Sequence, residues 1–429
     1  MHAVRPGWEG VRLVDVALST AGTNRASTDS ASIDTAGTDD EGTASSTGTA
    51  STAGIVPAIA YVDVVGEPEV GDRALLNVTA LERGLGTGGY AVLVALPDRP
   101  GAWPSPDPEA PGHLVKARYT PLQTMVLGVD DPEGEHHELL ADADDLDGLP
   151  VVAADLHSAL PAVVAGIRSR RPQARVAYVM TDGGALPAAF SRTCADLRRA
   201  GWIDSVITAG QAYGGDLEAV TVHSALLAAR HVLGADVVVV SQGPGNLGTG
   251  TRWGFSGVSA GEALNAAAVL GGTPIASLRV SEADPRPRHR GLSHHSSTAY
   301  GRVLAHPARM VVPTGSTGRA TTDGCLTAVR EQVAQLCAKA PHLTPVEVPV
   351  DGLLEHLADA PVRLSTMGRD LDSDAAAFLA AAAAGVHATS TAGVDATSTA
   401  SVHATSTACL DATSGCEEHH TSEGPTTRS

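Results

Sequence analysis

The feature that most constrains the fold is an alternation of strand-like and helix-like segments, which begins near Leu149 and repeats about every 30 residues. Short apolar runs, several rich in valine, are each followed by a longer segment with helical texture. The strand-like runs are 151–154, 175–180, 205–208, 237–240, 274–280 and 309–312, and the helix-like segments are 158–170, 186–200, 217–233 and 260–270. Such repetition predicts a parallel sheet with right-handed crossovers and helices on both faces. We therefore predict an α/β fold with a doubly wound, mostly parallel, Rossmann-like sheet.

The part of the chain before this alternation has a different texture. Four short strand-like runs, separated by turns rich in Gly and Asp, cover 8–18, 55–65, 70–77 and 90–96. They predict a small β-barrel-like domain over 1–110, which a Pro-rich linker near its end joins to an α/β domain over 111–345. A small domain of this kind is typically a module for assembly or packing.

Two segments lack the apolar residues that a folded core requires. Residues 21–54 are an insertion rich in Ser, Thr, Ala and Gly, and 386–429 are an octad repeat that begins with Val386-His-Ala-Thr-Ser-Thr-Ala-Gly. Neither can bury enough apolar surface to offset the entropy of ordering, so we predict that both are disordered and dispensable for folding. Between them, 346–385 is predicted to be a helical C-terminal segment with an alanine-rich helix over 375–384, which Gly385 ends.

The charge balance excludes some classes of partner. The formal net charge is -19, whereas nucleic acids and anionic membrane surfaces are bound by basic patches. The N-terminus has no apolar leader, no run of 18 apolar residues occurs, and the five cysteines form no C-x-x-C pair. We therefore expect a cytoplasmic protein that binds neither nucleic acid nor membrane; a homo-oligomer is compatible with the sequence.

A glycine-rich loop follows the strand-like run 237–240. Six glycines lie within 243–257, and the stretch 243–248 matches the pattern G-x-G-x-x-G. A dinucleotide site requires a helix to begin at once, and a P-loop requires a lysine; the sequence offers neither here. We predict a looser anion cradle of backbone N–H groups, which become accessible where side chains are absent. Its predicted ligand-binding residues are Gly243, Gly245, Asn246, Gly248, Thr249, Gly250 and Arg252.

Three further loops, 181–187, 210–218 and 282–296, follow strands and should project from the same edge of a parallel sheet. The loop 181–187 contributes Asp182 as an acid–base group and Gly183 and Gly184 as ligand-binding residues. The loop 282–296 contributes Arg288 and Arg290, whose planar guanidinium groups suit carboxylate or phosphate. Its His294 and His295 are candidate catalytic residues, although adjacent histidines on a strand would point in opposite directions.

One alternative remains open nearer the first strand of the α/β domain. Asp155 and His157 leave that strand two residues apart and are candidate metal ligands, while Ser158 is a candidate N-cap of the helix that follows. We assign no metal from the sequence, and the sequence identifies no cofactor.

Four long stretches resemble one protein family. MTDGGALPAAFSRT, GQAYGGDLEAVTVHSALLAARHVLGAD, SQGPGNLGTGTRWGFSG and SLRVSEADPRPRHRGLSHHS are similar to sequences of DUF3866, a bacterial family of unknown function. The resemblance covers 1–20 and 55–345. It implies no established activity, cofactor or catalytic residue.

The sequence thus favours an enzyme that binds a small anionic molecule, such as a phosphorylated metabolite, at the loops on the carboxyl edge of the sheet. One alternative is a non-catalytic ligand-sensing or assembly protein. The other is a metal-dependent hydrolase. A closed pocket lined by the His, Arg and acidic side chains would favour an enzyme, and an open apolar groove would favour a sensor.

Overall fold

The computed structural model describes residues 1–18, 54–99 and 109–391 of the chain. The predicted disorder of the insertion 21–54 and of the octad repeats therefore falls almost entirely outside the described residues. The described N-terminal part forms a five-stranded sheet of order β1-β2-β3-β5-β4. Its strands are β1 (Ala3–Pro6), β2 (Val11–Ala17), β3 (Ile55–Tyr61), β4 (Leu75–Asn77) and β5 (Ala91–Ala95), with short helices α1 (Val62–Val65) and α2 (Thr79–Glu82). Closure of this sheet into a barrel stays a prediction.

The second part is built on an eight-stranded sheet in which every pairing is parallel. The strand order is β11-β10-β9-β12-β8-β13-β16-β17. The strands are β8 (Pro150–Ala153), β9 (Val176–Thr181), β10 (Ser205–Ala209), β11 (Leu217–Ala219), β12 (Val237–Gln242), β13 (Thr273–Ala276), β16 (Ala308–Thr314) and β17 (Leu343–Pro349). All residues of β8, β9 and β12 are buried, which explains their continuous apolar runs. The predicted α/β fold with a parallel sheet is confirmed.

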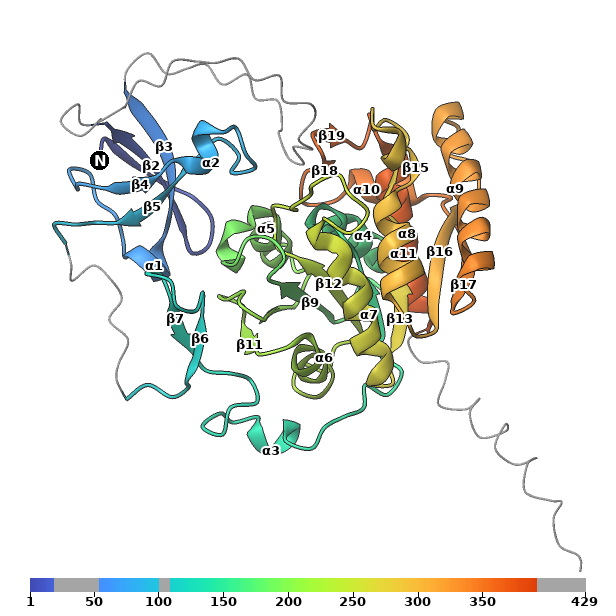
Figure 1. The fold of residues 1–429 in the computed structure, drawn as a ribbon, viewed down its shortest axis with the longest axis horizontal. Helices are drawn as coiled ribbons and strands as arrows, with labels where there is room; N and C mark the ends of the chain where they lie inside the picture. Colours follow the sequence, from blue (N-terminus) through green and yellow to red (C-terminus); the bar gives the residue numbers. More distant parts are fainter. Residues whose placement is uncertain (19–53, 100–108, 392–429) are drawn as a thin grey trace, which may run out of the picture. The chain divides into compact units, whose positions relative to one another are not determined.

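Helices connect the strands and cover the sheet (Figure 1). They are α4 (Leu160–Arg170), α5 (Arg192–Arg199), α6 (Val222–His231), α7 (Ser259–Val269), α9 (Ala320–Lys339), α10 (Leu353–Ala358) and α11 (Ala375–Thr391). The chain leaves β8 toward one edge of the sheet through α4, and it leaves β12 toward the other edge through α7. Right-handed crossovers in opposite directions place α4 and α7 on opposite faces. α11 packs on α4, and α6 packs on α7.

This topology creates a switch point between β8 and β12, which are neighbours in the sheet. The connections that follow these two strands diverge to opposite faces, so the ends of the strands are not covered by a shared helix. A crevice at such a point, outside the carboxyl ends of the strands, is where open α/β sheets place ligands. The loops that begin at Ala154 and Gly243 meet there.

Several boundaries differ from those predicted from the sequence. Residues 217–219 form the edge strand β11 instead of the first turn of a helix, because they pair with β10, and α6 begins only at Val222. Strand β17 was not predicted at all. Four of its seven residues are exposed, and they do not alternate regularly with the buried ones, so the sequence shows no strand pattern there. The predicted amphipathic helix over 321–339 is confirmed as α9.

The prediction that Gly385 ends the alanine-rich helix was wrong, because α11 continues to Thr391. Gly385 lies inside the helix, where a Cβ atom would stand 1.9 Å from the carbonyl oxygen of Val163 in α4. At Gly166 of α4 a Cβ atom would stand 2.0 Å from the carbonyl oxygen of Ala382. The two glycines therefore allow the backbones of α4 and α11 to touch. Val386 and Ala388, the start of the octad repeat, are buried in the same helix.

We expect Gly385→Ala to destabilise the fold by about 1–3 kcal/mol, because the added methyl group overlaps the α4 backbone. The matched control is Gly324→Ala in α9, where a Cβ atom meets nothing within 4 Å. There alanine should stabilise the helix by up to about 1 kcal/mol. Urea unfolding of both variants measures the difference; a stability change of the same sign in both would contradict the tight crossing.

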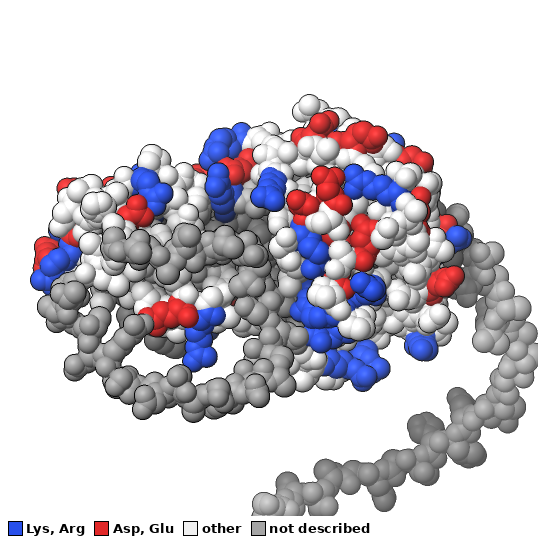
Figure 2. Space-filling view, turned by 90° about the horizontal axis from the view of Figure 1, so that it is seen from above, with Lys and Arg blue, Asp and Glu red and all other residues white. Residues whose placement is uncertain are grey.

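Charges of both signs are mixed on the surface. Figure 2 shows Lys and Arg side chains next to Asp and Glu side chains over one face of the molecule. Ion pairs such as Arg99–Asp72, at 2.8 Å, and Arg168–Asp204, at 3.3 Å, contribute to this pattern. None of the described helices is long and apolar enough to cross a membrane.

Candidate active site

The loops after β8 and β12 are joined at the switch point by the side chain of Gln242. Its Nε2 donates hydrogen bonds to the carbonyl oxygen of Asp155, at 2.9 Å, and to Oδ1 of Asn246, at 2.6 Å. Gln242 is the last residue of β12 and is buried. The amide thus fixes the start of the glycine-rich loop against Asp155, two residues after the end of β8.

Three of the predicted ligand-binding glycines, Gly183, Gly184 and Gly243, face closely packed atoms of the neighbouring loop instead of open space. A Cβ atom on Gly184 would stand 2.1 Å from the carbonyl oxygen of Gly243, and one on Gly243 would stand 2.4 Å from that of Ala185. A Cβ atom on Gly183 would lie 2.6 Å from Oε1 of Gln242. The backbone N–H of Ala185 also donates to the carbonyl oxygen of Pro244, at 2.7 Å. Close packing of loops 181–185 and 242–245 accounts for these glycines.

The middle of the glycine-rich loop forms a small hairpin. Gly248 bridges to Phe255, and the N–H of Thr249 donates to the carbonyl oxygen of Gly254, at 2.7 Å. Gly250 takes positive φ, as does Gly245 before the hairpin. Arg252 is exposed at the hairpin tip, as are Leu247 and Trp253 near it.

The end of the loop returns to the switch point. The ring of Phe255 stacks on the ring of His295 with a centroid distance of 3.7 Å and an interplanar angle of 7°. A Cβ atom on Gly257 would stand 2.7 Å from the carbonyl oxygen of Asp155. The loop therefore contributes packing to a cluster of side chains centred on Asp155.

Three histidines gather in this cluster. His289 ends a 3-10 turn (Pro287–His289), and His294 and His295 are the first residues of α8 (His294–Thr298). The ring centroids lie 4.4–5.0 Å apart. The expectation that the adjacent histidines point in opposite directions was wrong, because at the start of a helix successive side chains are turned by about 100° instead of alternating. Both rings contact the ring of His289.

Two of the histidines, His289 and His294, are held neutral by their surroundings. Burial and the charge of Arg279 lower the pKa of His289 to about 2, and burial together with His295 and Arg288 lowers that of His294 to about 4. Nearby positive charge thus disfavours protonation of either ring near neutral pH.

An ionised carboxylate and a guanidinium complete the cluster. Nη1 of Arg279 lies 3.4 Å from Oδ2 of Asp155 and 2.8 Å from Nδ1 of His295. The same Nδ1 lies 3.3 Å from Oδ2 of Asp155. Burial opposes ionisation of Asp155, but the hydrogen bond with His295 and the charge of Arg279 outweigh it and lower the pKa of the carboxyl group. Arg279 was missed by sequence reasoning; its only signal was its position near the end of the strand-like run 274–280, three residues after the end of β13.

The other predicted side chains lie in different surroundings. The carboxylate of Asp182 accepts a hydrogen bond from the N–H of Gln211, at 2.8 Å, and contacts the loop after β10 instead of the histidines. Arg288 is half-buried and its charge acts on His294, whereas Arg290 is exposed. The structure thus groups His294, His295 and Arg288, and it leaves Asp182 elsewhere.

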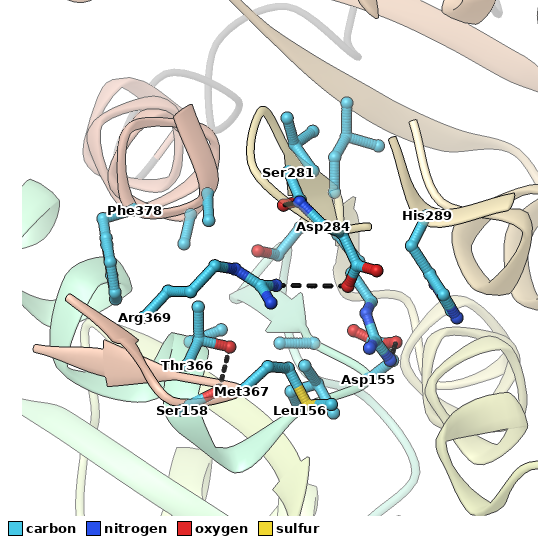
Figure 3. A pocket seen from close by; sticks show the side chains of 18 residues that line it. Asp155, Leu156, Ser158, Ser281, Asp284, His289, Thr366, Met367, Arg369 and Phe378 are labelled. Atoms are coloured by element: carbon cyan, nitrogen blue, oxygen red, sulfur yellow. Dashed lines mark hydrogen bonds and ion pairs between the residues drawn. The ribbon is translucent and has the colours of Figure 1, made fainter. Parts of the chain in front are cut away.

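A small cavity borders the cluster (Figure 3). Its volume is about 30 Å³, enough for about one water molecule, and Asp155, Arg279 and His289 line it. Arg369, from the hairpin β18 (Ser365–Thr366) to β19 (Arg369–Asp370), closes it and donates to Asp284, at 3.2 Å. The C-terminal segment 346–385 therefore supplies part of the wall.

His157, the sequence neighbour of Asp155, belongs to a separate network. Its Nε2 lies 2.7 Å from Oγ of Ser191, and its Nδ1 lies 3.0 Å from the hydroxyl of Tyr178. Ser191 Oγ also accepts from the N–H of Cys194 and caps α5. Since Asp155 and His157 contact different partners, their pairing as metal ligands is not supported by these contacts.

This network predicts a pH dependence of stability. Burial lowers the pKa of His157 from 6.5 to about 4, so the unfolded chain binds the proton first as the pH falls. Stability should decline from about pH 6.5 to about pH 4, by at most about 1.4 kcal/mol per pH unit from this residue. Urea unfolding of His157→Gln should show a shallower decline than the parent, and His306→Gln, at an exposed position, should follow the parent. Equal slopes for all three proteins would refute the assignment.

Comparison with known proteins places the chain in a family. The model of the family described as "Protein of unknown function (DUF3866)" matches residues 57–385, which include the whole histidine cluster, Asp155 and Arg279. No curated protein matches the chain significantly. The match covers most of the chain and agrees with the resemblance seen in the sequence. The chain therefore belongs to the DUF3866 family.

Proposed function

We propose that the chain is an enzyme that acts on a small anionic molecule bound at the switch point. The observation that supports this proposal best is the packing of three histidines, two of which have a lowered pKa, with an ionised Asp155 and Arg279 outside the ends of β8 and β13. Burying charged and titratable groups together costs free energy that an apolar cluster would not. Such clusters with shifted pKa values are characteristic of functional sites.

The charges near the histidines favour an anion. Arg279 and Arg288 both act on His294, and both guanidinium groups can form charge-assisted hydrogen bonds with carboxylate or phosphate oxygens. A bound anion would also raise the pKa of His294 toward neutrality, because an opposite charge nearby favours the protonated ring. The histidine would then be better suited to transfer a proton at physiological pH than it is in the free protein.

We assign the roles as follows. Arg279 and Arg288 bind the anionic group, His294 and His295 are the acid–base residues, and Asp155 orients His295. The glycine-rich loop contributes packing through Phe255 and Gly257. Anion binding by Gly248, Thr249, Gly250 and Arg252 of its hairpin stays a prediction. A cytoplasmic location and self-association stay predictions.

Anion binding can be tested with two arginines of the same loop. We expect inorganic phosphate or pyrophosphate to raise the melting temperature of the parent and of Arg290→Ala, whose side chain is exposed. Arg288→Ala should lose about 1.5–3 kcal/mol of binding free energy, which is roughly a 10–150-fold weaker affinity. Thermal-shift titrations measure these affinities. Equal affinity of both variants for every anion tried would rule out the assigned role of Arg288.

Catalysis can be tested without knowing the substrate. The parent protein, incubated with a mixture of cellular metabolites, should deplete one anionic compound and generate a product, as followed by mass spectrometry. His294→Gln should deplete the compound more slowly by at least about 100-fold, the usual effect of losing an acid–base group. A compound that is retained by the parent but never converted would favour the ligand-sensing alternative over an enzyme.

A further inference from the structure

We propose that His289, His294 and His295 form a three-histidine site for a divalent transition-metal ion of the zinc class. One ligand atom from each residue can be chosen so that all three lie within 4.8 Å of one another. His289 and His295 are almost fully buried, at 2% and 3% exposure. This inference rests on the proposed active site and deepens it: with the ion bound the histidines are metal ligands, and the acid–base roles assigned to His294 and His295 apply to the ion-free protein.

Two of the three histidines have an oxygen atom beside one ring nitrogen, as metal-binding histidines usually do. Nε2 of His294 is buried and has no hydrogen-bond partner among the described residues. Nδ1 of His289 lies 2.8 Å from Oγ of Ser293, and Nδ1 of His295 lies 3.3 Å from Oδ2 of Asp155. Metal-binding histidines typically donate the proton of their second ring nitrogen to an oxygen in this way, which fixes the tautomer and turns the other nitrogen to the ion.

The geometry requires only a modest contraction. Zinc–nitrogen bonds of about 2.0–2.1 Å in a tetrahedral site place neighbouring ligand atoms about 3.3 Å apart. From separations of up to 4.8 Å, side-chain rotation of the imidazoles can bring the atoms together. His294 and His295 share the first turn of α8, and Phe255 stacks on His295, so the rings are already confined to one side of the site.

The ligand set indicates the class of metal. Three imidazole ligands suit Zn²⁺ and neighbouring transition metals, whereas Mg²⁺ and Ca²⁺ prefer oxygen ligands. Three protein ligands also leave the fourth tetrahedral position open, as in catalytic zinc sites. Arg279 and Arg288 repel a cation, and the carboxylate of Asp155 offsets part of this repulsion. The same arginines and the metal would together attract an anionic oxygen at the open position.

In the present arrangement Arg279 also contacts Nδ1 of His295, at 2.8 Å. When a metal is bound at the other ring nitrogen, Nδ1 of His295 carries a proton and is a donor, as the guanidinium of Arg279 is. Two donors cannot form a hydrogen bond with each other, so metal binding requires Arg279 to turn from the ring to Asp155, which is 3.4 Å away. The sequence analysis assigned no metal, and it placed the adjacent histidines on a strand, where at most one of them could be a ligand. Their position at the start of α8 removes that objection.

The test is binding of Zn²⁺ or Co²⁺ to the full chain after treatment with a chelator, measured by calorimetry and by elemental analysis. We expect one tight equivalent per chain. Asp155→Asn should weaken binding roughly 10–100-fold, the usual effect of removing an outer partner of a ligand, and His294→Gln and His289→Asn should weaken it more. Circular dichroism checks that each variant is folded. Because His419 and His420 lie outside the described residues, the matched control is His419→Gln/His420→Gln, which should keep the tight equivalent.

Two results would overturn the metal site. One is a parent protein without a tight equivalent. The other is a folded His294→Gln variant that keeps the tight metal equivalent of the parent while the His419→Gln/His420→Gln control loses it. Phosphate binding is measured in parallel with chelator present. If Arg288→Ala and Arg290→Ala still differ in phosphate affinity but no metal binds to the parent, the anion site stands and the metal site falls. If metal binds but no anion distinguishes Arg288→Ala from Arg290→Ala, the assigned anion site fails and the metal site stands.

Discussion

A buried carboxylate needs positive charge or hydrogen-bond donors close to it, and Asp155 receives both from segments far along the chain. Arg279 lies 124 residues away in sequence and His295 lies 140 residues away. Both can reach Asp155 only because β13 pairs with β8 and because the chain after β13 folds back over the end of the sheet. The contacts of the Asp155 carboxylate therefore hold the histidines in this arrangement only because the strands have this order.

A second buried network has the same character. Asp374, at the start of α11, accepts from Arg369 and from the hydroxyl of Ser281, and Arg369 also reaches Asp284. Hydrogen bonds from Arg286 outweigh burial and hold the pKa of Asp284 below its ordinary value. These bonds anchor the C-terminal segment to the loop that carries the histidines. The candidate active site and α11 are thus connected by hydrogen bonds and ion pairs at the end of the apolar sheet.

The sequence predicted the elements whose signal is local. The strand-like run 237–240 and the amphipathic α9 are recognisable because each carries its pattern within a few turns or residues. It predicted that His294, His295 and Arg288 belong together, since they share one loop. It could not predict Arg279, whose role depends on a strand pairing, nor that Asp182 would be bound by the backbone of Gln211. It also misassigned the start of α8, because two adjacent histidines carry no periodicity, and Ser293, which caps that helix, was not recognised.

The crossing of α4 and α11 constrains the first of the octad repeats. This octad begins at Val386, and α11 buries its Val386 and Ala388. The glycine and alanine residues that let α11 approach α4 lie just before it. Substitutions at the buried positions of this unit are therefore filtered by the fold, so that a motif recognised by its repetition is here also a segment of the core.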